Sequence, residues 1–338
     1  MSILITGGAG YIGSHTVIEL LEDGYDVIII DNLSNSSIEV IDRIERITNK
    51  EVTFYHAELL DSNRLDMIFK SHHIKSVIHF AGSKSVAESI KHPIKYYENN
   101  VTTTINLCKV MSKYDVKHLI FSSSATVYGN PKKMPISENE PTEAINPYGQ
   151  TKLACERFLK DLSNADSEWK IIMLRYFNPV GAHPSGEIGE LPNGKPSNLM
   201  PNITQVAVGK QKKLYIYGND YPTKDGTGIR DFIHVVDLAR GHVAAFKNIA
   251  KFEGLQSFNL GTGEGYSVLE VIRTFEKVNS IKIPWKLKEK RDGDVAVSFA
   301  DTSKANKKLK WKAKKNLADM CRDAYNWELN RTKNKAYV

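Results

Sequence analysis

The sequence predicts an α/β fold of the Rossmann type, in which a doubly wound parallel sheet is joined to a smaller mixed α/β lobe. Short β-rich runs alternate with longer amphipathic stretches through the first half of the chain, as in βαβ units. A glycine-rich turn follows the first run and opens the first amphipathic stretch. The 338 residues also exceed the roughly 100–200 of a typical domain, so a second lobe is expected.

The predicted strands are short runs rich in apolar and β-branched residues. They span 2–6, 26–31, 52–55, 76–80, 117–121 and 170–174. Residues 27–30 are apolar without alternation, which is typical of a parallel strand buried on both faces. The longer stretches predict helices, including 11–23, 92–114 and 147–162.

The composition of the chain changes after residue 177. Residues 179–202 are rich in Gly, Pro and Asn and predict a long functional loop, followed by a weaker mixture of helices and short strands. We therefore expect a first domain of residues 1–178, to which a segment of about 229–262 returns, and a second lobe of residues 179–338.

Composition narrows the class of protein. The net charge is +7, but residues 282–315 hold 12 Lys/Arg against 4 Asp/Glu, so the rest of the chain is close to neutral. We interpret this cluster mainly as a solvated face rather than a nucleic-acid site. The sequence has neither an apolar run of the roughly 20 residues that span a membrane nor a signal-peptide pattern. Three widely spaced cysteines fit reduced thiols, and we expect a cytoplasmic protein that binds neither membranes nor nucleic acid.

The glycine-rich turn predicts a dinucleotide site. Residues 7–13 read Gly-Gly-Ala-Gly-Tyr-Ile-Gly, where a pyrophosphate can approach the backbone and meet a helix N-terminus. Asp31 ends the second strand, 21 residues after Gly10, where its carboxylate can accept hydrogen bonds from the adenosine ribose. The same carboxylate repels a 2′-phosphate, and no arginine follows it, so NAD is favoured over NADP.

A Tyr-x-x-x-Lys pattern occurs twice. Tyr128 and Lys132 are separated by a proline that forbids a helix, whereas Tyr148 and Lys152 follow an Asn-Pro helix start and share one helix face. We expect the Lys152 ammonium to lower the pKa of Tyr148 towards the range of a general base. Residues 122–124 are three serines at the end of the fifth predicted strand, and Ser124 can bind the same substrate hydroxyl.

Residues 121–129, 147–152, 174–184 and 226–235 together resemble the UDP-glucose 4-epimerases, a family of extended short-chain dehydrogenases/reductases. The resemblance covers essentially the whole chain. It implies interconversion of UDP-glucose and UDP-galactose through hydride removal to NAD at C4, rotation of a 4-keto sugar, and hydride return. It further implies that residues 1–178 bind NAD, that residues 179–338 bind the UDP-sugar, and that helices 92–114 and 147–162 form the contact of a homodimer.

The resemblance also implies a role for each site residue. Tyr148 would remove the 4-hydroxyl proton, assisted by Ser124, while Lys152 holds the nicotinamide ribose. The implied NAD-binding residues are Gly7, Gly10, Tyr11, Ile12, Asp31, Asn32, Asn35, Glu58, Leu59, Phe80, Ala81, Lys84, Asn99, Ser122, Tyr148, Lys152 and Tyr176. The implied substrate-binding residues are Ser124, Tyr148, Asn178, Asn198, Leu199, Tyr215, Tyr217, Arg230, Arg291, Asp294 and Ser298.

This chain departs from the family pattern at two positions, and a third position bears on the choice of sugar. Glu58 replaces a usual Asp, and Phe232 stands where Tyr is frequent, so one hydrogen bond to the uridine side could be missing. Ser298 aligns with a position that is small in relatives admitting N-acetyl sugars, which predicts that UDP-GlcNAc and UDP-GalNAc are also interconverted.

The alternatives are a nucleotide-sugar 4,6-dehydratase or decarboxylase of the same family and a non-catalytic dinucleotide-sensing protein. A dehydratase places an Asp-Glu pair where this chain has Ser124-Ala125. No metal site is predicted, because the histidines and cysteines lack ligand spacing.

Overall fold

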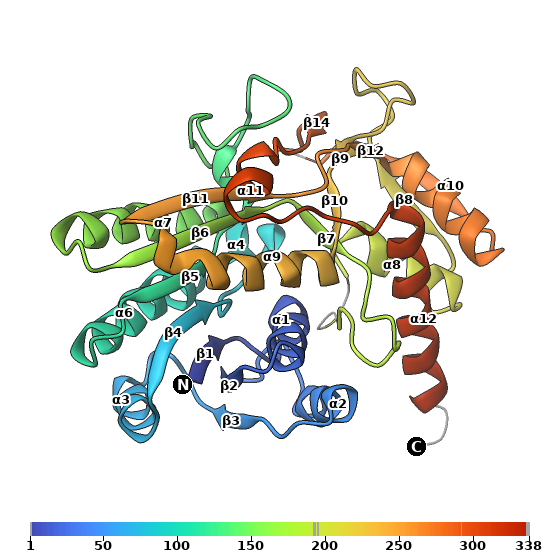
Figure 1. The fold of residues 1–338 in the computed structure, drawn as a ribbon. Coiled ribbons are helices and arrows are strands. Elements are labelled where there is room, and N and C mark those ends of the chain that lie inside the picture. The colour runs from blue at the N-terminus through green and yellow to red at the C-terminus, as the bar shows by residue number, and fades with distance from the viewer. Residues whose placement is uncertain (1, 192–193, 195, 292, 336–338) are drawn as a thin grey trace.

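The computed structural model describes residues 2–191, 194, 196–291 and 293–335 (Figure 1). Within these residues, seven strands form one parallel sheet in the order β11-β6-β5-β4-β1-β2-β3. Their bounds are β1 Ser2–Thr6, β2 Asp26–Asp31, β3 Thr53–His56, β4 Ile74–His79, β5 His118–Ser122, β6 Lys170–Tyr176 and β11 Leu255–Leu260. The strand order reverses between β1 and β4, and this is where doubly wound sheets bind their ligands.

Helices cover both faces of the sheet. On one face lie α1 (Tyr11–Glu22), α2 (Glu39–Thr48) and α9 (Val235–Asn248), and on the other α3 (Ser62–Ser71), α6 (Thr103–Lys113) and α7 (Pro147–Ala165). Successive residues of β1 alternate between the two cores: Ile3 and Ile5 pack with α1, and Leu4 packs on the opposite face. The Rossmann-type fold that the sequence predicts is confirmed.

The predicted helix 92–114 is wrong in one respect. The structure divides it into α5 (Pro93–Tyr97), a π-helical turn η1 (Glu98–Thr102) and α6, while α4 (Val86–Lys91) precedes it. The wider turn contains the buried Asn100, whose Oδ1 accepts from the Ser83 amide at 2.7 Å and whose Nδ2 donates to Thr151 Oγ1 at 2.9 Å. Such turns are frequent at functional sites, and apolar periodicity carries no signal for them.

The predicted loop 179–202 is also shorter than expected. It begins in a strand, β7 (Asn178–Val180), and ends inside a helix, α8 (Leu199–Ala207). Strand β7 pairs in parallel with β10 (Phe232–His234), and these backbone hydrogen bonds explain why the Asn-Pro-Val segment is extended.

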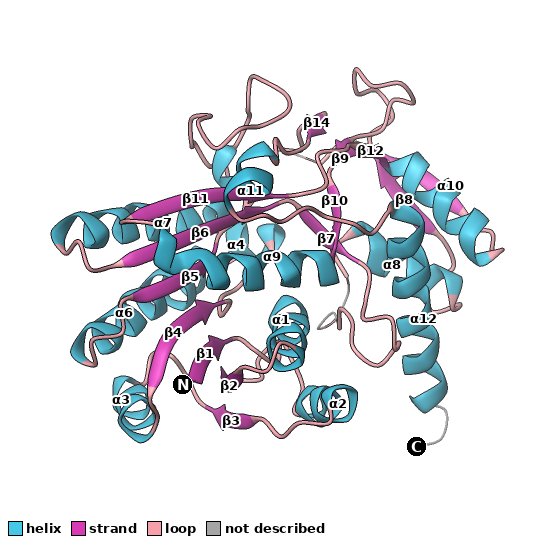
Figure 2. Ribbon diagram, in the orientation of Figure 1, coloured by secondary structure: helices cyan, strands magenta, loops and turns pink. Residues whose placement is uncertain are grey.

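Most of the remaining elements form the smaller lobe (Figure 2). It contains β9 (Ile229–Arg230) between β12 (Tyr266–Ser267) and β14 (Val297–Ser298), and β8 (Leu214–Tyr217) paired with β13 (Trp285–Lys288). Helices α8, α10 (Val268–Asn279) and α12 (Leu317–Lys335) pack around a separate core. Phe232 lies in this core at 4% exposure, so the place where a Tyr is frequent is a buried one here.

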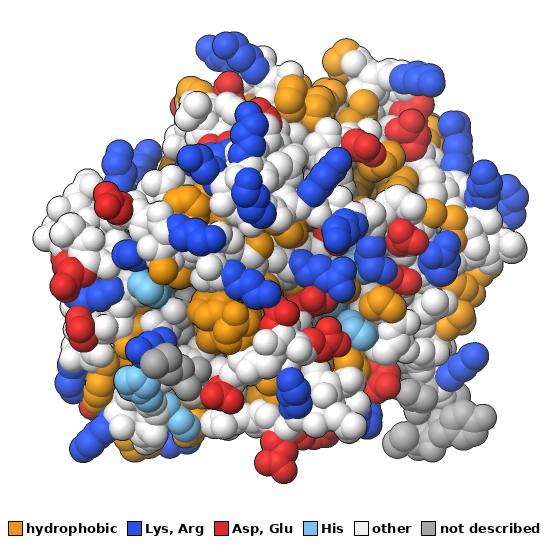
Figure 3. Space-filling model, in the orientation of Figure 1, with side chains coloured by type: hydrophobic (Ala, Val, Ile, Leu, Met, Phe, Trp, Pro, Cys, Tyr) orange, Lys and Arg blue, Asp and Glu red, His pale blue; other side chains and the backbone are white. Residues whose placement is uncertain are grey.

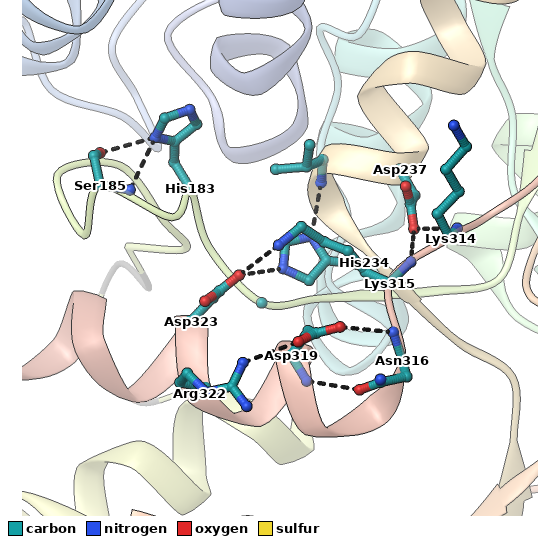
Figure 4. A network of polar contacts seen from close by, with 12 residues as sticks. His183, Ser185, His234, Asp237, Lys314, Lys315, Asn316, Asp319, Arg322 and Asp323 are labelled. Atoms are coloured by element: carbon teal, nitrogen blue, oxygen red, sulfur yellow. Dashed lines mark hydrogen bonds and ion pairs between the residues drawn. The ribbon is translucent and has the colours of Figure 1, made fainter. Parts of the chain in front are cut away.

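Helix α12 is fastened by polar contacts to the junction of β10 and α9 (Figure 4). His234 Nδ1 accepts from the Val236 amide, so its Nε2 carries the proton that is donated to Asp323 on α12, at 3.0 Å. Lys315 Nζ reaches the same Asp323 carboxylate at 2.9 Å. These contacts fix the lobe against the sheet.

Basic and acidic side chains are mixed on the surface of the protein. Figure 3 shows lysines and arginines spread over the face that carries α9 and α11 (Ser303–Lys308), with acidic side chains among them. In the described part of the chain, no helix is long and apolar enough to cross a membrane.

Candidate active site

The glycine-rich turn joins β1 to α1 at the strand-order reversal. Gly7 has φ +71°, and a Cβ added there would lie 2.7 Å from the Ala81 amide nitrogen at the end of β4. A Cβ on Gly13 would collide with the Gly7 carbonyl oxygen. The turn therefore holds its shape only with glycine at these positions, as in the tight turns whose backbone a pyrophosphate can approach.

Asp31 lies at the carboxyl end of β2, directly beside this turn. Its carboxylate accepts from the Ala9 amide (3.0 Å), the Leu33 amide (2.9 Å) and Ser36 Oγ (2.9 Å). These donors hold the carboxylate in place, and Asp31 as a whole is only 8% exposed. Asn32 follows and donates to both Glu58 oxygens at 3.1 Å, with Leu59 buried behind them, whereas Asn35 is exposed in the next turn.

The segment after β4 brings further predicted residues to the same edge. Phe80 and Ala81 follow β4, and both of their amides donate to the Thr6 carbonyl, at 2.9 and 3.1 Å. Asn99 Nδ2 donates to Ser83 Oγ at 2.8 Å, beside Lys84. The cradle formed by the glycine turn, Asp31 and this segment fits an adenine dinucleotide, and its Gly7 and Gly13 positions have no room for a Cβ.

The predicted catalytic residues meet at the carboxyl ends of β5 and β6. Tyr148 is buried in the first turn of α7, and Ser124 lies near enough to its hydroxyl to oppose the effect of burial on its pKa. Lys152, one turn later, donates through Nζ to the Ser122 carbonyl at 2.7 Å. Tyr176 Oη lies 2.6 Å from Ser122 Oγ. Asn146 caps α7 by accepting from the Gly149 amide, and Pro147 occupies the first turn, as the sequence predicts.

The expected tuning of Tyr148 is not present in this structure. Burial raises the pKa of Tyr148 above its ordinary value of 10, and the nearby Ser124 side chain opposes this rise. Burial also lowers the pKa of Lys152 to about 8, while its ammonium is directed to the Ser122 carbonyl. Desolvation of the buried phenolate is the larger effect on the pKa of Tyr148 and outweighs the charge of Lys152, from which the lowered pKa was predicted.

The predicted nucleotide-binding residues line the smaller lobe. Tyr215 and Tyr217 lie two positions apart on β8 and thus share a face, and the Arg291 guanidinium lies 3.9 Å from the centre of the Tyr217 ring. Arg230 Nη2 lies 3.6 Å from Asp294 Oδ1. Ser298 on β14 is the register partner of Arg230 on β9.

Two more predicted residues frame the entrance to α8. Asn198 is its N-cap position and Leu199 its first residue, while Asn178 is exposed at the start of β7. A helix N-terminus at this position offers unpaired amides to an anionic group.

Further supporting residues were not predicted from the sequence. Besides Asn100, Thr126 Oγ1 donates to Ser124 Oγ at 2.9 Å. Glu156 on α7 forms a buried ion pair with Arg175 on β6 and accepts from Ser123 Oγ at 2.5 Å. Glu156 follows Lys152 by one helical turn, so the sequence could have placed it on the same face of α7 as Lys152. No sequence pattern identifies Arg175 as its partner.

Comparison with known proteins agrees with this geometry. A family model described as GDP-mannose 4,6 dehydratase matches residues 4–324. The UDP-glucose 4-epimerase of Bacillus subtilis (strain 168) is 57% identical over 328 residues, which cover 97% of this chain and 97% of that protein.

Two solved structures are similar over nearly the whole chain. UDP-glucose-4-epimerase from Stenotrophomonas maltophila, with bound NAD and formylated UDP-arabinopyranose, has a TM-score of 0.97 and 48% identity, covering 99% of each chain. UDP-glucose 4-epimerase from Bifidobacterium longum, in complex with NAD+ and UDP, has a TM-score of 0.95 and 52% identity, covering 100% of each chain.

The family model and the relatives carry the names of different reactions, a dehydration and an epimerisation. Identity of 57% over 97% of both chains groups this chain with the epimerase relatives. This chain is an extended short-chain dehydrogenase/reductase and belongs to the UDP-glucose 4-epimerase family.

Proposed function

We propose that this chain interconverts UDP-glucose and UDP-galactose by inverting the configuration at C4, with NAD as its cofactor. The observation that carries the proposal is the burial of Tyr148 in the first turn of α7, with Ser124 near its hydroxyl at the carboxyl end of β5. Lys152 stands one turn behind it. This is the arrangement of a general base and its partner for a carbinol proton.

The NAD assignment rests on the residues of the cradle. We assign its pyrophosphate to the Gly7–Gly13 turn, its adenosine ribose to Asp31, and its nicotinamide half to Lys152 and Tyr176. When bound, NAD supplies a hydride acceptor for C4 and then a donor to the opposite face of the sugar. Its oxidised ring is cationic, and this charge opposes the desolvation that raises the pKa of Tyr148.

The side chains of this protein manage the proton and the sugar. Tyr148 takes the 4-hydroxyl proton while Ser124 holds that hydroxyl, and Tyr148 returns the proton after the keto sugar has turned. Turning requires a firmly held nucleotide and a loosely held hexose. We assign Arg230 and Arg291 to the diphosphate. Asn178, Asn198, Leu199, Tyr215 and Tyr217 are the further contacts that we assign to UDP.

One assay separates this proposal from the alternatives. The purified protein is incubated with UDP-galactose and no added NAD, and the products are resolved by anion-exchange chromatography. We expect UDP-glucose, because the hydride returns and the cofactor is regenerated in every turnover. A product lighter by one water would indicate a dehydratase, and binding without any conversion would indicate a sensing protein.

We also propose that N-acetylated sugars are accepted. Ser298 has a small side chain on β14 beside Arg230, where a larger residue would occupy space next to the hexose. Replacing it by Tyr should abolish activity on UDP-GlcNAc and retain activity on UDP-glucose, while Ser298→Ala retains both. Equal loss of both activities, or no loss, would contradict this assignment.

We further propose the domain division that the sequence suggests, with NAD bound by residues 1–178 plus about 229–262 and the UDP-sugar by residues 179–338. Helix α9 packs on α1, and β11 adds an edge strand beside β6, which supports the return of the second segment. Limited proteolysis with and without NAD tests it, since NAD should protect sites in both parts of the first domain.

A homodimer through residues 92–114 and α7, with α4 beside them, is our proposal for the assembly. Ile90 and Ile94 are 62% and 75% exposed, with Tyr97 beside them at 45%, an apolar surface next to α7. Light scattering should give twice the chain mass, and Ile94→Lys should give a monomer. The matched control Met67→Lys, on the exposed side of α3, should remain dimeric.

We propose the cytoplasm as the compartment. Cys108, Cys155 and Cys321 are buried, unpaired thiols, which suit a reducing environment. Cell fractionation with a tag on the chain tests this.

A further inference from the structure

Glu190 lies between the two nucleotide sites and belongs to neither set of predicted residues. Its Oε1 accepts from Lys84 Nζ at 2.9 Å and from Asn198 Nδ2 at 3.2 Å. Lys84 follows β4 on the cofactor side, and Asn198 precedes α8 on the substrate side. One carboxylate oxygen thus joins side chains from the two halves of the site.

The backbone of Glu190 is held independently of these contacts. Its carbonyl oxygen accepts from Trp327 Nε1 on α12 at 3.0 Å. A Cβ on the preceding Gly189 would lie 2.5 Å from the Trp327 ring, so the loop lies flat on that ring. Its carboxylate therefore extends from an anchored backbone and is only 13% exposed.

A carboxylate near two anionic ligands repels them unless its charge is balanced by a paired cation. Lys84 has three N–H donors, and Glu190 engages one of them, leaving the others for a phosphate. Asn198 likewise keeps one amide N–H and its carbonyl oxygen. Pairing orients a long, half-exposed lysine that would otherwise be free to rotate.

We propose that Glu190 is a positioning residue that couples the two nucleotide sites, so that a change at Lys84 on the NAD side is transmitted to Asn198 on the UDP side. The inference rests on the proposed function, because it takes Lys84 as a contact of NAD and Asn198 as a contact of UDP. It adds an energetic link between them that neither assignment requires.

The test is a double-mutant cycle on UDP affinity, measured by titration calorimetry on the protein with NAD in excess. Lys84→Met should weaken UDP binding about fivefold and Glu190→Ala about tenfold, as expected for coupled contacts. In the Glu190→Ala background, Lys84→Met should have no further effect. Lys84→Arg, which keeps the charge, should bind UDP as the unaltered protein does.

Glu187→Ala is the matched control. Glu187 lies on the same loop and pairs with Arg46 at 3.0 Å on the surface, away from both Lys84 and Asn198. Its UDP affinity should stay within about twofold, since surface pairs contribute little. If Glu190→Ala does not fold, Glu190→Gln takes its place in the cycle, because it keeps the shape and removes the charge.

An unchanged UDP affinity in Lys84→Met, or effects of the two substitutions that simply multiply, would overturn the coupling. Epimerase activity of the unaltered protein is measured in parallel. Loss of coupling with that activity intact refutes Glu190 alone, whereas a protein that neither binds UDP nor converts UDP-galactose refutes the proposed function and this inference together.

Discussion

The buried ion pair between Glu156 and Arg175 predicts a large loss of stability for Glu156→Gln. Arg175 Nε and Nη2 donate to the two Glu156 oxygens at 2.9 and 2.7 Å, and both side chains are less than 10% exposed. Glutamine has nearly the same shape but no charge. The substitution therefore leaves the Arg175 guanidinium buried without a counter-ion, with only neutral acceptors: one amide oxygen at position 156, the Tyr128 hydroxyl and the Glu138 carbonyl.

Breaking a buried pair from one side typically costs about 3–5 kcal/mol. With an unfolding entropy of about 2.1 cal/mol/K per residue, a chain of 338 residues loses roughly 4–7 °C in Tm. Differential scanning calorimetry measures the shift. As a control, Glu39→Gln removes the exposed partner of Arg43 on α2 and should shift Tm by less than about 1 °C.

A second variant tests the reason for the loss. Replacing both partners, Glu156→Leu with Arg175→Met, removes the unpaired charge and should cost less than Glu156→Gln alone. A Tm for Glu156→Gln that equals the unaltered protein, or a double variant less stable than the single one, would refute the reasoning that an uncompensated buried charge dominates.

Three further predictions concern chemistry, cofactor and pH. Tyr148→Phe should lower kcat about 10²–10⁴-fold with UDP affinity unchanged, and more than a tenth of the activity remaining would contradict its role as the base. Gly13→Ala should yield protein without NAD by absorbance, whereas Gly24→Asn, in open space with φ +85°, should retain it; equal NAD content in the two would count against the glycine cradle. Burial lowers the pKa of His15 and His79 to about 3, from an ordinary value of 6.5. Protons therefore bind the unfolded chain better, so stability is complete above pH 6.5 and falls below it, by about 2 kcal/mol per histidine at pH 5. Equal urea midpoints at pH 7 and pH 5 would contradict this.

The large sheet could be read from the sequence because local patterns determine it. The second predicted strand, Val27 to Ile30 with Asp31 at its end, lies where expected. Because the strand is buried on both faces, four consecutive residues are apolar. The start of α7 was equally visible, because Asn146 and Pro147 act within one turn.

Features that depend on distant partners were not visible. The π-helical turn at Asn100 is held by Ser83 and Thr151, which lie elsewhere in the chain. The role proposed for Glu190 depends on its contacts with Lys84 and Asn198, which lie far from it in the sequence or on another element of the fold. The pKa of Tyr148 was predicted in the wrong direction because burial is a property of the folded chain, not of a motif.

The route of the backbone between the sheet and the smaller lobe has a consequence for how such proteins diversify. The chain leaves the sheet after β6, returns through α9 and β11, and leaves again through β12. No single cut separates the smaller lobe, so it cannot be exchanged between relatives as one continuous cassette. Grafting a lobe from a relative therefore requires several segments to be transplanted together, whereas substitutions at individual positions leave the shared frame intact.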